Sequence, residues 1–179
     1  MRAKLQFGIL AGLLLPALLA APSLAASVDE YQVKAAFVVN FASFVEWPRE
    51  AFPSAAAPVN LCILGRNPFG HTLEAIAEGK TALGRPLAVR ELSDVRQIAG
   101  CHIVFVSSSE RLRFRLILDS LRDSTIFTVG DASDFLAQGG VANLWLDQGK
   151  VRVEISPDAA RAHNLRISSR LMSLSKAAN

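Results

Sequence analysis

The segment LCILGRNPFGHT, Leu61 to Thr72, has the outline of a phosphate-binding loop. An apolar run leads into Gly65, a second glycine follows five positions later, and His71 stands where such a loop carries its lysine. A mostly neutral imidazole does not supply the positive charge that phosphates need. Asn67-Pro68 also predicts that a helix begins inside the loop, where backbone N–H groups would have to hold the phosphates. The segment is therefore interpreted as a strand followed by a helix, and not as a nucleotide site.

The serines Ser107-Ser108-Ser109 follow a predicted strand, at the end where open α/β sheets place their ligands. A serine nucleophile would need a G-x-S-x-G turn or a positioned base, and the string VSSSE provides neither. Capping of a helix, with Glu110 in its first turn, accounts for the same residues. These serines are therefore interpreted as a helix N-cap.

The other candidate groups do not form a catalytic or metal-binding pattern. The histidines are widely spaced and form no H-x-x-x-H or H-E-x-x-H pair; they are His71, His102 and His163. Asp131 and Asp134 follow another predicted strand and are better explained as caps of a short helix than as acid catalysts. The sequence predicts no enzyme activity, no metal site and no cofactor.

The first residues predict export of the protein. Arg2 and Lys4 precede an apolar run that ends in small residues at Ser23-Leu24-Ala25, the pattern of a cleaved secretory signal. Removal of residues 1–25 from the chain of 179 would leave a single domain over 26–179 with net charge +1. We therefore expect a periplasmic protein, and the near-neutral charge with scattered arginines argues against a nucleic-acid binder.

Two cysteines, Cys62 and Cys101, remain in the expected mature chain. An even pair in an exported protein predicts a disulfide, whereas in the cytosol two buried thiols would be the usual interpretation. Closing a loop of this length would remove about 4 kcal/mol of unfolded-state entropy in the chain-entropy model.

Alternating strands and helices would position these residues. Apolar recurrence predicts a first helix from Asp29 to Trp47, with Val33, Phe37, Phe41 and Phe44 on one side and a second apolar side. Further helices are predicted over 67–78, 93–98, 109–122, 157–161 and 167–176, with Leu112, Leu116 and Leu118 inward in the third of these. A short helix, capped by Ser133 or Asp131, is predicted to end at Gly139-Gly140. Strands are predicted over 59–64, 84–90, 102–106, 125–129, 141–146 and 150–155.

These elements predict an α/β fold. Continuous apolar strands that alternate with helices indicate a three-layer sandwich, with a mostly parallel sheet and helices on both faces. The turn Asp147-Gln148-Gly149 joins the last two strands into an antiparallel hairpin, which we expect at one edge of the sheet.

The predicted fold does not by itself explain several aromatic and arginine residues. Trp47 and Trp145 are accompanied by Arg161, Arg166 and Arg170, and the last two would share one face of the final helix. Such side chains are the usual anchors of protein interfaces, although half-buried core aromatics have the same sequence signature. Binding is therefore favoured over chemistry.

An ordered set of strings from about Val28 to Lys176 resembles the YfiR-like family of small periplasmic proteins. These strings are YQVKAAFVVNFASFVEWP, LCILGRNPFG, GRPLAVREL, CHIVFVSSSE, TVGDASDFLAQGGVANL, VRVEIS and LRISSRLMSL. The resemblance implies a repressor that binds the periplasmic domain of an inner-membrane diguanylate cyclase. It also implies release by an outer-membrane lipoprotein that binds peptidoglycan, so that cyclic di-GMP and biofilm formation rise.

The resemblance further implies a homodimer and redox-sensitive folding through cysteines. Cys62 and Cys101 match one cysteine pair of the family, whereas the positions of a second pair near Gly139-Gly140 are not cysteine here. By likeness, the partner contact is expected around Glu154 and Arg166, with Arg152 and Arg170 beside them.

A binding module of another class remains an alternative. In it, a crevice above Gly65, Ser107 and Gly130, at the carboxyl ends of the parallel strands, would hold a small molecule. A hydrolase that uses the serines is a third and weaker hypothesis.

Overall fold

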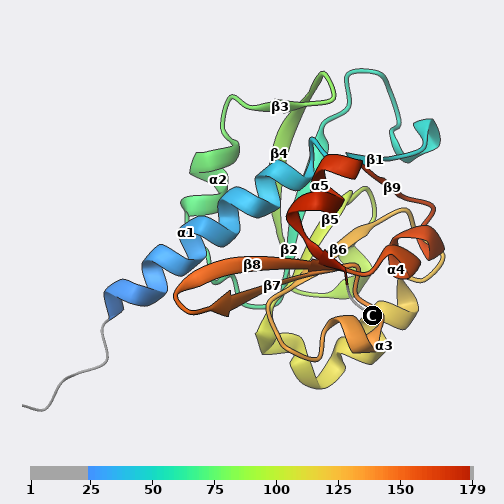
Figure 1. Cartoon of the computed structure of the whole chain (residues 1–179). Helices are drawn as coiled ribbons and strands as arrows, with labels where there is room; N and C mark the ends of the chain where they lie inside the picture. The colour runs from blue at the N-terminus through green and yellow to red at the C-terminus, as the bar shows by residue number, and fades with distance from the viewer. Residues whose placement is uncertain (1–23, 178–179) are drawn as a thin grey trace, which may run out of the picture.

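The computed structural model describes residues 24–177, and an eight-stranded sheet forms the centre of this part (Figure 1). In spatial order the strands are β10 (Lys176–Ala177), β8 (Lys150–Ile155), β7 (Ala142–Asp147), β6 (Phe127–Gly130), β5 (Ile103–Val106), β2 (Val59–Leu64), β4 (Arg85–Leu92) and β3 (Thr81–Ala82). The strands from β7 to β4 run parallel, in the 2-1-3-4-5 order of one common doubly wound sheet. The two hairpins, β7–β8 and β3–β4, are antiparallel.

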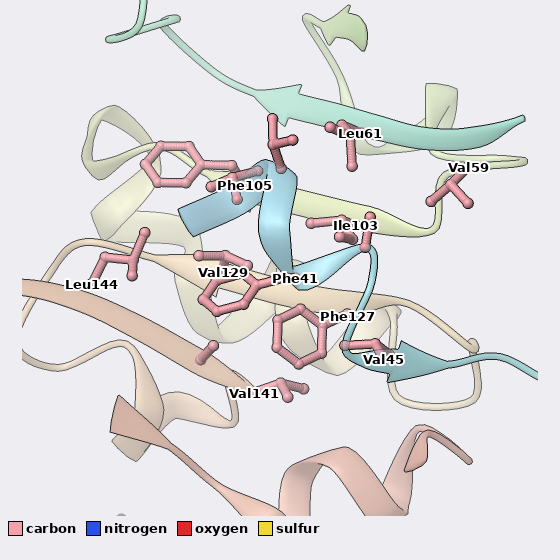
Figure 2. Packing of buried hydrophobic residues seen from close by; sticks show 14 of the residues in the cluster. Phe41, Val45, Val59, Leu61, Ile103, Phe105, Phe127, Val129, Val141 and Leu144 are labelled. Carbon is pink, nitrogen blue, oxygen red and sulfur yellow. The ribbon is translucent and has the colours of Figure 1, made fainter. Parts of the chain in front are cut away.

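Alternation along the strands divides the core into two clusters, one on each face of the sheet. Side chains of β2, β5 and β6 such as Leu61, Phe105 and Phe127 enter the larger cluster with α1, where the Phe41 and Phe127 ring centroids are 5.3 Å apart (Figure 2). Their neighbours Cys62, Leu64, Val104 and Val106 enter the smaller cluster with α3. Burial on both faces explains why these strands are continuous apolar runs.

Five α-helices, α1 (Leu24–Phe41), α2 (Thr72–Ala77), α3 (Phe114–Ser120), α4 (Pro157–Ala162) and α5 (Ser169–Leu174), cover the two faces. Residues of α1, α2, α4 and α5 belong to the larger cluster, whereas α3 lies on the opposite face (Figure 1). Short 3-10 helices complete the layers at Arg49–Ala51, Val95–Gln97, Ser108–Arg113 and Leu136–Gln138. The predicted α/β sandwich with helices on both faces and an antiparallel hairpin is confirmed.

The expectation that the hairpin forms the edge of the sheet is wrong in one detail. β10 pairs in parallel with Glu154 and Ile155 of β8, so it lies outside the carboxyl end of that strand. A strand of two residues has no periodicity of its own, and its pairing depends on a neighbour already being in place.

The first helix ends earlier than predicted, at Phe41 rather than Trp47. Val45 and Glu46 form β1 (Val45–Glu46), which pairs antiparallel with β9 (Arg166–Ile167). The residues of the second predicted apolar side are buried; they are Val38, Val39, Ala42 and Val45. Phe41 of the first side is buried as well, whereas Val33 is 39% exposed. Long-range packing therefore leaves the amino-terminal part of the first side at the surface.

The helix expected from Asn67 begins only at Thr72. The Asn67 side chain accepts a hydrogen bond from the Phe69 N–H at 2.8 Å, which closes a local turn instead of a helix cap. Gly70 has φ of 56°, a left-handed conformation that also delays the helix. The helix therefore starts where the helix of a phosphate-binding loop would start, so its position does not argue against a nucleotide site. The absence of the lysine at position 71 still does.

Two of the three inward positions predicted for the helix over 109–122 are wrong. Leu118 is buried as predicted, but Leu112 and Leu116 are exposed. The other inward side chains are Phe114, Ile117 and Leu121. The segment begins with a 3-10 helix over Ser108–Arg113, and its three-residue period shifts the buried face of the α-helical turns that follow.

The predicted disulfide between Cys62 and Cys101 is confirmed. It joins β2 to the turn that precedes β5, across a sequence separation of 39 residues. The Asn60 side chain donates a hydrogen bond of 2.7 Å to the carbonyl of Gly100 beside it, so the same junction is held by a covalent and a polar contact.

Candidate interaction surface

The four residues expected to contact a partner lie in two places. Arg152 and Glu154 share one side of β8, and Arg152 is exposed, with its Nε 3.5 Å from Asp147 Oδ2. Glu154 is only half-exposed because β10 pairs beside it, at Lys176. Arg152 is therefore at an open strand edge, and Glu154 is not.

Arg166 and Arg170 belong to a different part of the surface. Arg166 lies in β9, opposite Glu46 of β1, and not in the last helix as predicted. That helix starts after Ser168, whose side chain accepts a hydrogen bond from the Leu171 N–H, and Arg170 lies over the ring of Phe44 at 6.0 Å. The expectation that the two arginines share one face of the last helix is therefore wrong, because Arg166 lies in a strand and Arg170 in a helix.

An apolar groove extends between α1 and the β7–β8 hairpin. One cavity of about 470 Å³ is lined by Val33, Phe37, Leu146 and Val151, and a neighbouring cavity of about 720 Å³ shares Phe37 and Val151 and adds Trp145 and Leu174. Leu146 is 49% and Leu174 68% exposed. The sequence signal for this groove was the amino-terminal part of the first apolar side of α1, Val33 and Phe37, which line it.

A buried ionic cluster holds the amino-terminal part of α1 against the sheet. The Tyr31 hydroxyl donates to Asp131 Oδ2 at 2.7 Å, and Lys34 Nζ lies 3.4 Å from the same oxygen and 2.6 Å from Glu30 Oε1. Burial and the adjacent Asp131 carboxylate raise the pKa of Tyr31. Asp131 therefore does not cap the short helix as predicted, and that helix follows Phe135 without a side-chain cap. Sequence reasoning missed this cluster because its partners are 100 residues apart.

A second buried cluster surrounds His102. Its ring stacks on Phe52 at 4.3 Å and meets the edge of Trp47, while Arg85 lies over the other face of Phe52 at 3.8 Å. The Arg85 guanidinium also donates to the carbonyl groups of Ser54, Ala55 and Ala57. Trp47 is thus a core residue of this cluster, and not an exposed anchor.

Protein side chains occupy the expected ligand crevice. A Cβ added at Gly65 would lie 2.7 Å from both Ser109 Oγ and Glu110 Cγ, and one added at Gly130 would lie 2.3 Å from the Phe135 ring. Ser109 Oγ also accepts a hydrogen bond from the Arg66 N–H at 3.0 Å. These contacts fill the space directly above two of the three residues that the small-molecule alternative needs.

The polar residues at these strand ends have structural roles. Ser107 caps the 3-10 helix over Ser108–Arg113 by accepting from the Ser109 N–H, as predicted. His102 and His163 are buried and bonded to backbone groups. Within residues 24–177 no group of three or more acidic, cysteine or histidine side chains could hold a metal ion, and no helix has the length and hydropathy of a membrane span.

Comparison with known protein families identifies the family of this chain. A family model described as YfiR/HmsC-like matches residues 31–176. The chain belongs to the YfiR/HmsC-like family. Membership supports a periplasmic regulator of cyclic di-GMP signalling in general terms, and the family is a regulatory one.

A solved structure shares the fold at low sequence identity. A conserved domain protein from Vibrio cholerae O1 biovar El Tor is similar with a TM-score of 0.55 and 9% identity, over 83% of this YfiR/HmsC-like chain and 60% of its own length. The ABC domain from Streptococcus pneumonia, in complex with L-Trp, gives a TM-score of 0.47 and 11% identity, over 66% of this chain and 54% of that one. This chain therefore spans about half to three fifths of these structures. No curated protein matches it.

Proposed function

We propose that the protein is a periplasmic repressor that binds the periplasmic domain of an inner-membrane diguanylate cyclase and keeps it inactive. An outer-membrane lipoprotein would compete for the repressor, so that the cyclase is released by mass action and cyclic di-GMP rises. Residues 1–25, most of which lie outside the described residues, would be a cleaved signal, and the mature domain over 26–179 would act as a homodimer. The family match over residues 31–176 carries this proposal.

The surface supports a role in protein binding. Exposed Leu146 and Leu174 border an apolar groove, and a surface of this kind is characteristic of an interaction site. Arg152 lies beside the groove, and arginine and aromatic side chains are the usual anchors of interfaces. A small-molecule module remains the second candidate, but the side chains over Gly65 and Gly130 leave it without a specific observation in its favour.

The first test replaces Glu154 with Lys. Glu154→Lys reverses one charge beside Arg152 on the hairpin, and we expect it to weaken partner binding about tenfold while the protein stays folded. The matched control is Glu78→Lys, at an exposed position after α2. Binding is measured by co-purification with the membrane diguanylate cyclases of the native host and with the lipoprotein, and folding by circular dichroism.

Cyclic di-GMP measured in cells that lack the gene gives the direct readout. Deletion should raise the nucleotide, and wild-type protein and Glu78→Lys should lower it again. A deletion strain with unchanged cyclic di-GMP would overturn the repressor proposal. Equal co-purification of Glu154→Lys and wild-type protein would instead move the contact away from the hairpin.

A further inference from the structure

The outer edge of β8 is open over four residues. β10 pairs only with Glu154 and Ile155, and within residues 24–177 no strand pairs with the outer side of Lys150–Val153. Unpaired strand edges can template the addition of a further strand. The backbone groups and side chains around the edge determine which kind of strand it accepts.

The hairpin turn decides which backbone groups face outward. Gln148 and Gly149 have φ of 47° and 76°, as in a two-residue type I′ turn, so the flanking pair Asp147 and Lys150 is a hydrogen-bonded pair. Hydrogen-bonded and non-bonded pairs alternate along an antiparallel ladder. The N–H and C=O groups of Val151 and Val153 therefore point away from β7 and toward the open edge.

The open edge lies at the floor of the larger cavity of the groove. Phe37 and Leu174 line this cavity from the helical side, and Trp145 and Arg152 line it from the opposite side of the hairpin. An added strand would thus meet apolar side chains on one face and the basic side chains of Lys150 and Arg152 on the other. Alternate side chains of such a strand would face these two surfaces in turn.

The charges on this edge disfavour a second copy of the same chain. Two identical edges pair antiparallel about a two-fold axis perpendicular to the sheet, and residues opposite each other then lie on the same face. Over the open residues, such registers place Lys150 or Arg152 opposite Lys150 or Arg152 of the copy. Like charges directly opposite each other are destabilising. Asp147 pairs with Arg152 on this face and Glu154 lies beyond it, so Lys150 and Arg152 are the charged residues of β8 within the open stretch.

We propose that the edge of β8 over Lys150–Val153 binds an extended segment of a partner protein in which acidic and apolar residues alternate. Backbone hydrogen bonds from both groups of Val151 and from the Val153 N–H would give affinity, and the acidic residues opposite Lys150 and Arg152 would give specificity. The Val153 carbonyl faces β10, which pairs with the next residue of β8. The inference rests on the proposed function, because it names the chemistry of the partner segment at the proposed surface.

Short capped peptides with alternating valine and glutamate test the proposal, and matched peptides carry lysine in place of glutamate. Each is titrated into the protein with its disulfide intact, followed by backbone NMR and amide hydrogen exchange. We expect shifts and protection centred on Val151 and Val153, and binding of the lysine peptide about tenfold weaker, since it loses two charge pairs.

Variants define the residues responsible. Arg152→Glu should reverse the preference between the two peptides, whereas Lys80→Glu, at an exposed position after α2, should leave it unchanged. Val151→Pro removes an outward N–H and leaves the pairing with β7 intact, so it should weaken both peptides. If Val151→Pro does not fold, the peptide preference of Arg152→Glu still tests the proposal.

The outcomes separate this inference from the proposed function. Equal affinity for both peptides, shifts centred elsewhere, absence of binding at millimolar peptide, or dimerisation that protects Val151 would each overturn the inference. Cyclase binding that is unchanged in Arg152→Glu and Val151→Pro would also overturn it and leave the repressor intact. Unchanged cyclic di-GMP on deletion would overturn the repressor, while the peptide titrations would remain a valid test of the edge.

Discussion

Asp131 ties the end of β6 to the first helix through a side chain that is 3% exposed. It receives the Tyr31 hydroxyl hydrogen bond and faces the Lys34 ammonium group, which is also 3% exposed. Removal of one member of a buried pair leaves the other charge without compensation, and this costs more than the pair itself contributes. The cluster is therefore a strong local determinant of where α1 lies.

We expect Asp131→Ala to lower the free energy of unfolding by about 3 kcal/mol, since Lys34 retains only the half-exposed Glu30. The control is Asp158→Ala, which removes an exposed pair with Arg161 and should cost less than about 1 kcal/mol. Urea unfolding measures both. Equal losses in the two variants would show that the buried cluster adds nothing beyond a surface pair.

Two backbone contacts fix the tautomer of His102. Nδ1 accepts from the Asn60 N–H at 3.1 Å, so Nε2 carries the proton and donates to the Ala51 carbonyl at 3.2 Å. Burial lowers the pKa of His102 from 6.5; the hydrogen bond to Ala51 raises it in part, and the nearby positive charge of Arg85 lowers it. Protonation would place an N–H opposite the N–H of Asn60.

This arrangement predicts a loss of stability with acid. Because the pKa is lower in the folded protein, the unfolded chain binds a proton first as the pH falls below about 6.5. The free energy of unfolding should fall by up to about 1.4 kcal/mol per pH unit until the folded-state pKa is reached. Urea unfolding between about pH 7.5 and pH 5.5 measures the slope. His102→Gln should reduce it, and the exposed His71→Gln should not; the opposite result would assign the slope to another group.

At the scale of elements, the disulfide fastens the two central strands of the sheet. Cys62 lies in β2 and Cys101 precedes β5, and both side chains are buried in the cluster beneath α3. β2 and β5 flank the point where the order of the strands reverses. The covalent link therefore acts where strands distant in sequence must find each other.

We expect the double variant Cys62→Ala, Cys101→Ala to lose about 2–4 kcal/mol of stability, because the unfolded chain regains loop entropy. Wild-type protein unfolded with and without reductant should show the same difference. A loss well below about 1 kcal/mol would mean that the ladder between β2 and β5 already orders this junction.

At the scale of the whole molecule, the larger cluster extends from Trp47 to the hairpin that carries Trp145. Trp47 belongs to the larger cluster near β1, whereas Trp145 lies in the hairpin at the other side of the sheet. The larger cluster is continuous and includes Leu144 and Val153 of that hairpin. Cooperative unfolding is therefore expected across the domain.

The variants Trp47→Phe and Trp145→Phe each retain one tryptophan to report unfolding. In each variant the fluorescence transition should coincide with the circular dichroism transition of the same protein. An earlier fluorescence transition from Trp145 alone would reveal that the hairpin opens separately from the rest of the sheet.

The sequence by itself determined the six longer strands of the sheet, the hairpin and the disulfide. Apolar β-branched runs such as Val59–Leu64 are local signals, and so is the glycine turn after Asp147. Cys62 and Cys101 were a single pair with no competing partner in the chain. Local chemistry was sufficient for these features.

Only the tertiary structure decided which side of each helix is buried and which surface is open. α1 has two apolar sides, and contact with the sheet buried the second side and Phe41 of the first but left Val33 at the groove. Arg166 entered a strand because Glu46 lay opposite it, and Asp131 met Tyr31 from 100 residues away. These outcomes depend on contacts between distant segments, and the periodicity of a single segment carries no information about its neighbours.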